Sequence, residues 1–308
     1  MRTIKIFLFF FICISTILAL IIFFLFASTK ERGGDKIISP IINSVAKSSK
    51  EVLSIFTTGI DKRIIESLSK SQGIYSVVVI DLKSNQTYSL NPDRTYESAS
   101  LYKLWVMAAT YQAISAGRLK RTDVLKDSIE NLNKSFSIAS EEAELSTGNI
   151  EMTVEDALEK MIIVSDNYSA LLLTKKIGLQ NINSFLKTES LAHSKTSLPP
   201  VTTASDIALF YLKLYKHMIV DSKSSSEMID LLKKQAINDR IPKYLPSGIS
   251  VAHKTGELDN VKHDAGIIFT PNGDYILVML SDTDNSTKAA EGMALLSKQI
   301  YLEFTSSH

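Results

Sequence analysis

Ser100 and Lys103 place a hydroxyl and an amine three residues apart, at the start of the apolar segment Leu101–Ile114. Residues spaced i and i+3 share one face of a helix, so the amine can act as a base toward the hydroxyl. The start of a helix also offers free backbone N–H groups and a positive dipole end to developing negative charge. The pattern predicts Ser100 as a nucleophile and Lys103 as its base.

This spacing is not specific by itself, and the simplest interpretation of Ser100 alone is a helix N-cap. Three other pairs share the spacing: Ser44/Lys47, Ser67/Lys70 and Ser184/Lys187. The segment that follows Ser100 distinguishes it, because a helix that is apolar on every side is buried. Burial would also lower the pKa of Lys103 and make its amine a usable base.

Two further tripeptides carry polar groups at structurally defined places. Ser165-Asp166-Asn167 lies between the apolar segments Val154–Val164 and Ala170–Leu173, which indicates a turn at the edge of the core. Lys254-Thr255-Gly256 follows the predicted strand Ser250–His253, where a cation and a hydroxyl can hold an anion. Glycine on an edge strand also permits close approach of a substrate backbone. Taken singly, each tripeptide is more simply a turn or a cap.

Strand patterns occur near both ends of the chain, whereas helical patterns fill the middle, from Ser100 to about Lys234. We expect an antiparallel sheet built from both ends, with a second, helical lobe inserted between them and a substrate cleft between the lobes. The predicted strands are Ile74–Leu82, Thr87–Leu90, Ser250–His253, Asp264–Thr270 and Asp274–Asp282, and predicted helices include Asp61–Lys70 and Thr287–Phe304.

The first residues predict a membrane anchor. Ile6–Ala27 is uncharged and apolar, long enough at roughly 22 residues to span a bilayer, and follows Arg2 and Lys5. We expect residues 1–29 to form an uncleaved transmembrane segment, with a cleaved signal peptide as the alternative. Residues 30–60 would form a stalk and residues 61–308 one catalytic domain outside the cytoplasm.

Composition excludes several other functions. The 308 residues carry a formal net charge of +1, without the basic excess typical of nucleic-acid binding. The single cysteine, Cys13, lies in the apolar segment, so the exported part can form no internal disulfide. The histidines show no metal-ligand spacing. We therefore expect a monomer that needs no metal or other cofactor.

From about Gly73 to Phe304, the order and spacing of the three motifs resemble those of class A β-lactamases and of the wider penicillin-recognising serine hydrolases, which include D,D-peptidases. Thr202–Asp206, which opens a helix before the last strands, fits the same family. The resemblance implies an α+β fold with a five-stranded antiparallel sheet flanked by helices, and an all-helical lobe.

The resemblance also implies catalytic roles. Ser100 would attack a carbonyl carbon and become acylated, with Lys103 as the base or part of the proton relay. Ser165 would pass a proton to the leaving nitrogen, and Lys254 nearby would lower the relevant pKa values. The backbone N–H groups of Ser100 and Glu257 would form the oxyanion hole.

The remaining motif residues would bind substrate. Asn167 would hold the amide side chain of the substrate, and Asp166 would be structural. Lys254 and Thr255 would bind the substrate carboxylate, and Gly256 completes this motif.

Two departures from class A enzymes limit the expected activity. Those enzymes use a loop glutamate to activate the deacylating water, yet Tyr168–Val201 contains one acidic residue, Glu189, at the end of a predicted helix. Without such a base the acyl-enzyme should hydrolyse slowly. Val261–Gly266 also lacks the arginine that often clamps the carboxylate, for which Lys262 or His263 could substitute.

Three functions remain open on this reasoning. The first is a membrane-bound, extracytoplasmic hydrolase that opens β-lactams and so confers antibiotic resistance. The second is a D-alanyl-D-alanine-type peptidase acting on peptidoglycan peptides. The third is a module that binds a β-lactam or a wall peptide without turnover. The protein would be secreted if its N-terminal segment were cleaved.

Overall fold

The computed structural model describes Leu68 and residues 73–306. The predicted anchor at residues 1–29, the predicted stalk and all of the predicted helix Asp61–Lys70 except Leu68 lie outside the described residues. Within the described part of the chain, no helix has the length and apolar character needed to span a bilayer.

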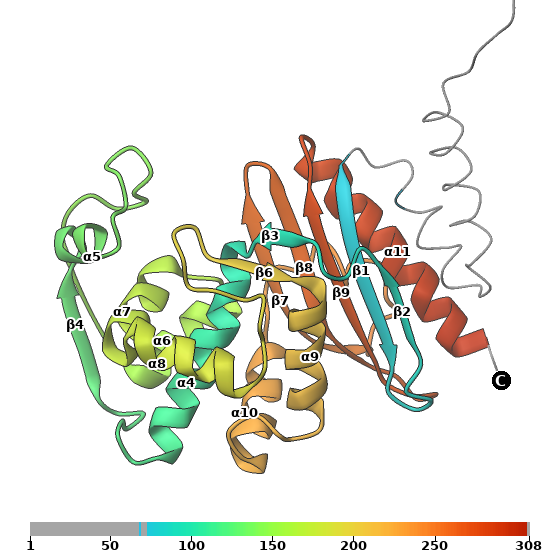
Figure 1. The fold of residues 1–308 in the computed structure, drawn as a ribbon, viewed down its shortest axis with the longest axis horizontal. Helices are drawn as coiled ribbons and strands as arrows, with labels where there is room; N and C mark the ends of the chain where they lie inside the picture. The colour runs from blue at the N-terminus through green and yellow to red at the C-terminus, as the bar shows by residue number, and fades with distance from the viewer. Residues whose placement is uncertain (1–67, 69–72, 307–308) are drawn as a thin grey trace, which may run out of the picture. The chain divides into compact units, whose positions relative to one another are not determined.

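A five-stranded antiparallel sheet forms the larger lobe, as predicted (Figure 1). The strands run in the order β2 (Thr87–Leu90), β1 (Ile74–Asp81), β9 (Tyr275–Asp282), β8 (Val261–Phe269) and β7 (Ser250–Leu258). The pairing of β1 with β9, from Ile74 opposite Asp282 to Asp81 opposite Tyr275, joins the two ends of the domain. β7 therefore lies at one edge of the sheet.

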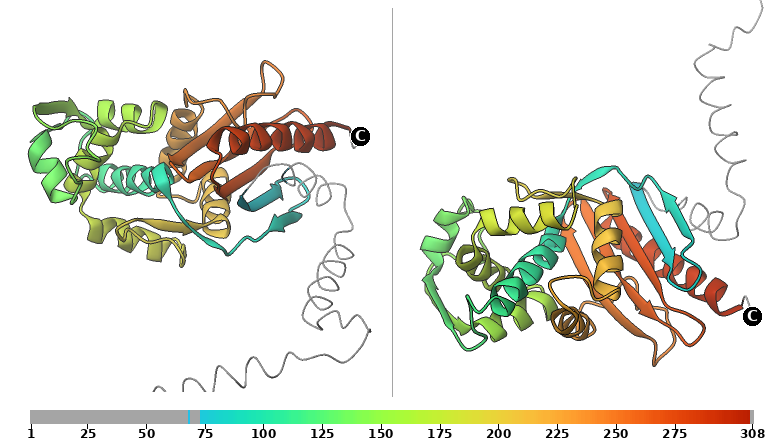
Figure 2. Two further views of the ribbon diagram at one scale, coloured as in Figure 1. Left: turned by 90° about the horizontal axis from the view of Figure 1, so that it is seen from above. Right: turned by 60° about the horizontal axis from the view of Figure 1, so that its bottom comes forward.

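Both faces of this sheet are covered. Val77 and Val79 pack against one face with α11 (Ser286–Ser306), whereas Val78 packs against the other with α9 (Ala204–Tyr215). Successive side chains of a strand point to opposite faces, so a strand buried on both sides needs an unbroken apolar run. This explains the β-branched composition of β1. Figure 2 shows α11 running along its face of the sheet.

The second lobe surrounds α4 (Lys103–Ser115), whose residues Leu104–Ala108 are at most 1% exposed. The burial of this helix on all sides matches its uniformly apolar sequence. The helices of this lobe are α5 (Ile129–Ser135), α6 (Val154–Ile163), α7 (Asn167–Ile177) and α8 (Leu179–Thr188), and α10 (Ser222–Leu232) also packs against α4.

Four short strands were not predicted, and three of them, β4 (Val124–Ser128), β5 (Asn149–Thr153) and β6 (Val201–Thr203), lie within the stretch from Ser100 to about Lys234 that we predicted to be helical. β4 pairs with β5 in the second lobe, so that lobe is not purely helical. β3 (Thr95–Glu97) pairs with β6. Segments of three to five residues are too short to display a clear alternation of apolar and polar side chains.

β7 is also longer than predicted, because it continues through Lys254-Thr255-Gly256 to Leu258. Its pairing with β8 extends from Ser250 opposite Phe269 to Leu258 opposite Val261. The third motif therefore lies within an edge strand and not at its end.

Gly266 on β8 gives a test of this pairing. An added Cβ would lie 2.5 Å from the carbonyl oxygen of Ala252 and 2.5 Å from Cβ of His253, on β7. We expect Gly266→Ala to lower the free energy of unfolding by about 3 kcal/mol, since neither backbone can yield freely. Gly117→Ala is the matched control, because its Cβ would meet nothing within 4 Å and only its φ of +68° is unfavourable. It should cost about 1 kcal/mol. If the two variants lowered the free energy of unfolding equally, as measured by thermal or urea unfolding, the close pairing of β8 with β7 at Gly266 would be contradicted.

Candidate active site

Ser100 lies in a cleft of about 860 Å³. The cleft is lined from both lobes, by the segment around Ser100, by Asn167, by a loop before β6 and by the end of β7. Its lining residues are Glu97, Ala99, Ser100, Tyr102, Ile138, Glu142, Asn167, Pro199, Pro200, Glu257, Leu258, Asp259 and Asn260. Its size and mixed lining suit a peptide-sized acyl compound.

The turn that carries Ser100 is a single 3₁₀ turn, Ala99–Tyr102, that precedes α4. Ala99 has a φ of +44°, in the left-handed region that costs a non-glycine residue about 1 kcal/mol. Two backbone hydrogen bonds hold the turn, from Leu101 N to Ser98 O at 3.0 Å and from Ser98 N to Pro200 O at 2.8 Å. Ser100 is therefore presented by a fixed backbone and does not cap the helix.

Residues of β7 and β8 pack against the turn that carries Ser100 and against the residues before it. A Cβ on Gly256 would lie 3.2 Å from Ser98 O and 3.3 Å from Ala99 Cβ, so glycine lets the turn pack closely against β7. His263 accepts a hydrogen bond at Nδ1 from Ser281 N and donates from Nε2 to Glu97 O at 2.8 Å. Gly256 therefore serves the packing of the protein as well as any approach of substrate.

Two lysines converge on Ser165 from opposite lobes. Lys254 Nζ, from β7, donates to Ser165 Oγ at 2.9 Å, and Lys103 Nζ, from the first turn of α4, lies 3.2 Å from the same oxygen. Lys103 also donates to Ser165 O at 2.5 Å and to Asn167 Oδ1 at 2.6 Å. Both lysine residues are 0% exposed.

This environment disfavours the ammonium forms. Burial lowers the pKa of Lys103 to about 8, although the carboxylates of Asp166 and Glu144 oppose the shift. Burial, reinforced by the positive charge of Lys103, lowers the pKa of Lys254 well below its ordinary value. The site therefore contains amines that can lose a proton near neutral pH.

The second motif forms a turn and a helix start. Ser165 has a φ of +60°, and Asp166 caps α7 by accepting a hydrogen bond from Ser169 N at 2.7 Å. This is the structural role expected of Asp166. Asn167 is the first residue of α7, and its Nδ2 donates to Glu144 Oε1.

The hydroxyl of Ser100 makes no hydrogen bond to any described residue, and Lys103 bonds instead to Ser165 and Asn167. Ser100, in the turn before α4, is thus near this network without a hydrogen bond to it. Such contacts commonly tighten only when a substrate is bound.

Arg240, in the loop between α10 and β7, is a site residue that the sequence did not reveal. It is 0% exposed, donates from Nη2 to Glu257, and its charge contributes to the lowered pKa of Lys254. Its Nε atom has no hydrogen-bond partner among the described residues, whereas Nη1 forms an ion pair with Asp239 Oδ1 at 3.4 Å. No motif marks this position, because the loop reaches the motif only through the fold.

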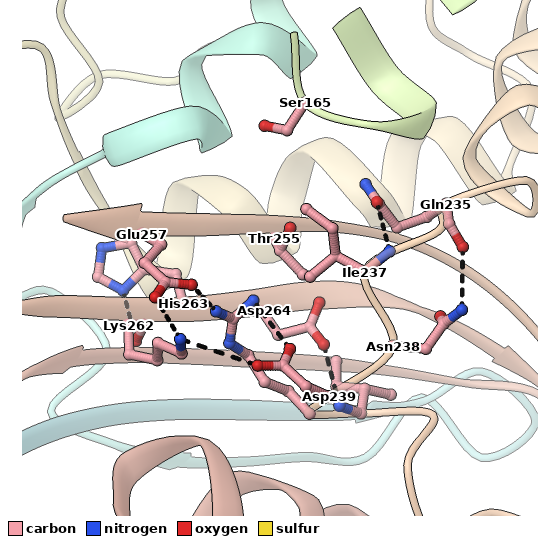
Figure 3. A network of polar contacts seen from close by, with 12 residues as sticks. Ser165, Gln235, Ile237, Asn238, Asp239, Thr255, Glu257, Lys262, His263 and Asp264 are labelled. Carbon is pink, nitrogen blue, oxygen red and sulfur yellow. Dashed lines mark hydrogen bonds and ion pairs between the residues drawn. The ribbon is translucent and has the colours of Figure 1, made fainter. Parts of the chain in front are cut away.

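The two cations proposed in place of the missing arginine are otherwise engaged. Lys262 Nζ pairs with Glu257 Oε1 at 2.5 Å and lies 3.8 Å from Asp239 Oδ2 (Figure 3). Burial lowers the pKa of His263 to about 4, so its ring is neutral at pH 7. Arg240 also pairs with Glu257, but of these three residues it is the one whose charge contributes to the lowered pKa of Lys254.

Glu189 does not reach the cleft. It is the C-terminal cap of α8, and its carboxylate pairs with Lys213 Nζ at 3.0 Å. The loop that follows, residues 190–200, contains no aspartate or glutamate and contributes Pro199 and Pro200 to the cleft. In the part of the chain that the structure describes, no group of three or more His, Cys, Asp or Glu side chains is arranged to hold a metal ion.

A family model described as "Beta-lactamase enzyme family" matches residues 59–304. Among solved structures, a β-lactamase from Sphaerobacter thermophilus is 23% identical with a TM-score of 0.71, covering 81% of this chain and 98% of that chain. PBP-A is 20% identical with a TM-score of 0.71, covering 81% and 97%. A β-lactamase from Chitinophaga pinensis is 16% identical with a TM-score of 0.70, covering 82% and 100%. No curated protein matches the chain.

The repulsion between the two buried lysines can be measured. Lys103→Met should raise the pKa of Lys254, because it removes a neighbouring positive charge and keeps the apolar volume. A pH titration followed by the ¹³Cε NMR signals of labelled lysines would report the change. Lys126→Met, at an exposed lysine paired with Glu151, is the control and should leave this titration unchanged. A Lys254 signal that titrates identically in Lys103→Met would refute the coupling.

Proposed function

The chain belongs to the β-lactamase enzyme family, and we propose that it opens β-lactams through a covalent acyl-enzyme at Ser100. The observation that carries this proposal is the hydroxyl of Ser165 held between Lys103 and Lys254, beside the cleft that contains Ser100. A nucleophile, a base with a lowered pKa and a hydroxyl that can relay protons are the requirements of acyl transfer to serine.

In the proposed acylation, the neutral amine of Lys103 accepts the proton of Ser100 as Oγ attacks the carbonyl carbon. When the C–N bond breaks, the leaving nitrogen takes a proton from Ser165 Oγ. The ammonium of Lys103, which is within hydrogen-bond distance of Ser165, then restores that proton. The proton thus moves from Ser100 to the leaving nitrogen without a net change at either lysine.

The cleft supplies the remaining groups. Ser100 and Glu257 both line it, so their backbone N–H groups can stabilise the oxyanion. β7 is the edge strand of the sheet, which leaves one side of its backbone open to an extended substrate. Lys254, Thr255 and the buried guanidinium of Arg240 would attract the substrate carboxylate.

Hydrolysis of the acyl-enzyme should be slow. The loop at residues 190–200 carries no carboxylate, and Glu189 is paired with Lys213. This observation favours a second candidate, a D-alanyl-D-alanine-type peptidase that uses the same serine and lysines on wall peptides. A module that is acylated but does not turn over remains a third possibility.

We further propose that the catalytic domain acts outside the cytoplasm, tethered by residues 1–29. The support is the apolar segment Ile6–Ala27, preceded by Arg2 and Lys5. A substrate of the bacterial wall would be accessible from that side of the membrane. Cleavage of residues 1–29 would instead release the catalytic domain from the membrane. We also predict that the protein is a monomer.

Covalent labelling tests the nucleophile. Incubation of the purified protein with benzylpenicillin should add the mass of one penicillin at Ser100, and Ser100→Ala should abolish the adduct. Ser184→Ala is the matched control, because Ser184 has the same spacing to a lysine but is exposed on α8. Intact-mass spectra with no adduct and no turnover by the wild-type protein would exclude both enzymatic functions.

The acylation rate should depend on pH. Because the neutral amine is the base and the pKa of Lys103 is about 8, the rate should rise as the pH increases through that value. The expected gain is about tenfold between about pH 7 and 9, the ratio of the neutral fractions. Stopped-flow measurement with a chromogenic cephalosporin would give the profile. A rate that is flat over this range would exclude Lys103 as the base.

A further inference from the structure

The two ends of the cleft differ in charge. At the β7 end, Arg240 and Lys262 both pair with Glu257 and lie within 4 Å of Asp239, and the charge of Arg240 also acts on the buried Lys254. Although partial burial opposes the shift, Lys262 and Arg240 lower the pKa of Glu257, so its charge is matched by these cations. The substrate carboxylate would therefore be bound at this end.

At the opposite end, the loop between α5 and β5 brings two carboxylates to the cleft. Glu142 lines the cleft, and Glu144 Oε1 accepts a hydrogen bond from Nδ2 of Asn167. Within the described residues neither carboxylate forms a salt bridge, and no lysine or arginine is among the residues that line the cleft. The cation that acts on Glu144 is the buried Lys103, whose pKa Glu144 raises, so the solvent-facing side of this end is anionic.

The position of Glu144 is fixed by its neighbours. Leu145 N donates to the hydroxyl of Tyr168 at 3.1 Å, and Asn133 Nδ2 donates to Leu145 O at 2.8 Å. Tyr168 directly follows Asn167 on α7, so the loop is anchored to the same helix start that holds the amide. Glu144 therefore lies next to the cleft, bonded to the lining residue Asn167, with its side chain exposed.

Asn167 indicates which part of a substrate would meet Glu144. Its Oδ1 is occupied by Lys103 and one Nδ2 hydrogen by Glu144, which leaves the second Nδ2 hydrogen as a donor. In the proposed function this amide binds the acyl side of the substrate. A substituent on that side would therefore lie beside the carboxylate of Glu144.

We infer that Glu144, together with Glu142, selects substrates that carry a primary amine on the acyl side of the scissile amide. This inference rests on the proposed function and specifies its substrate class, a compound with a carboxylate at one end and an ammonium group at the other. An acyl-side carboxylate would be repelled by the same residues. Because both glutamates are exposed, we expect Glu144 to contribute about fivefold in rate and Glu142 less.

Three penicillins with the same nucleus provide the test: ampicillin, with an α-amino group, benzylpenicillin, which is neutral there, and carbenicillin, with a carboxylate. Second-order acylation rate constants would be measured on the full chain at about pH 6.5, where an α-amino group is mostly protonated. We expect ampicillin to react fastest and carbenicillin slowest. High salt should narrow the difference, because it screens exposed charges.

The variants separate charge from structure. Glu144→Gln should reduce the ampicillin-to-carbenicillin ratio about fivefold or more, and Glu142→Gln should do the same to a smaller extent. Glu141→Gln, on the same loop but outside the cleft lining, should leave the ratio unchanged. A general disturbance of Asn167 would slow all three penicillins equally and leave their ratio intact, which would count against selection by charge.

The two proposals can fail separately. If all three penicillins label Ser100 at equal, salt-independent rates in the wild-type protein, the inference about Glu144 is overturned and the proposed function stands. If none of them labels Ser100, the proposed function fails and the inference fails with it.

Discussion

Two lysine side chains, both removed from solvent, share one hydroxyl oxygen, and this arrangement constrains the rest of the fold. Like charges repel strongly in a medium of low dielectric constant, so Lys103 and Lys254 would separate if their backbones were free. They stay together because α4 is packed on all sides and β7 is held in the sheet by β8. Docking of the two lobes therefore favours loss of a proton from these amines, and the chemistry follows from that loss.

One buried carboxylate moderates this repulsion. Asp264 on β8 is 0% exposed and accepts hydrogen bonds from Ile241 N at 2.9 Å and from Nδ1 of His253 at 2.8 Å. Its negative charge raises the pKa of Lys254, against the larger effects of burial and Lys103. By holding the backbone of Ile241 it also fixes the adjacent Arg240. Asp264 thus links the cationic end of the cleft to the interior of the sheet.

The sequence allowed prediction of the parts of the site that depend on local pattern. Ser100 and Lys103 stand out because the helix behind them is uniformly apolar, and the pairing of the terminal strands follows from their β-branched residues. Arg240 and Glu144 could not be found in this way, since each lies in a loop whose place in the cleft depends on contacts with distant residues. The partners of Lys262 and His263, which are Glu257 and Glu97, were not visible in the sequence for the same reason.

The pairing of β1 with β9 has a consequence for how the protein is made. Its partners, such as Ile74 and Asp282, are roughly 200 residues apart, so the sheet has high contact order and a large loop-closure cost. β9 cannot take its place until Asp282 has left the ribosome, and Lys254 is held only once β8 and β9 are present. The nascent chain is thus expected to remain open, without its lysine pair, until the last strand of the sheet has been synthesised.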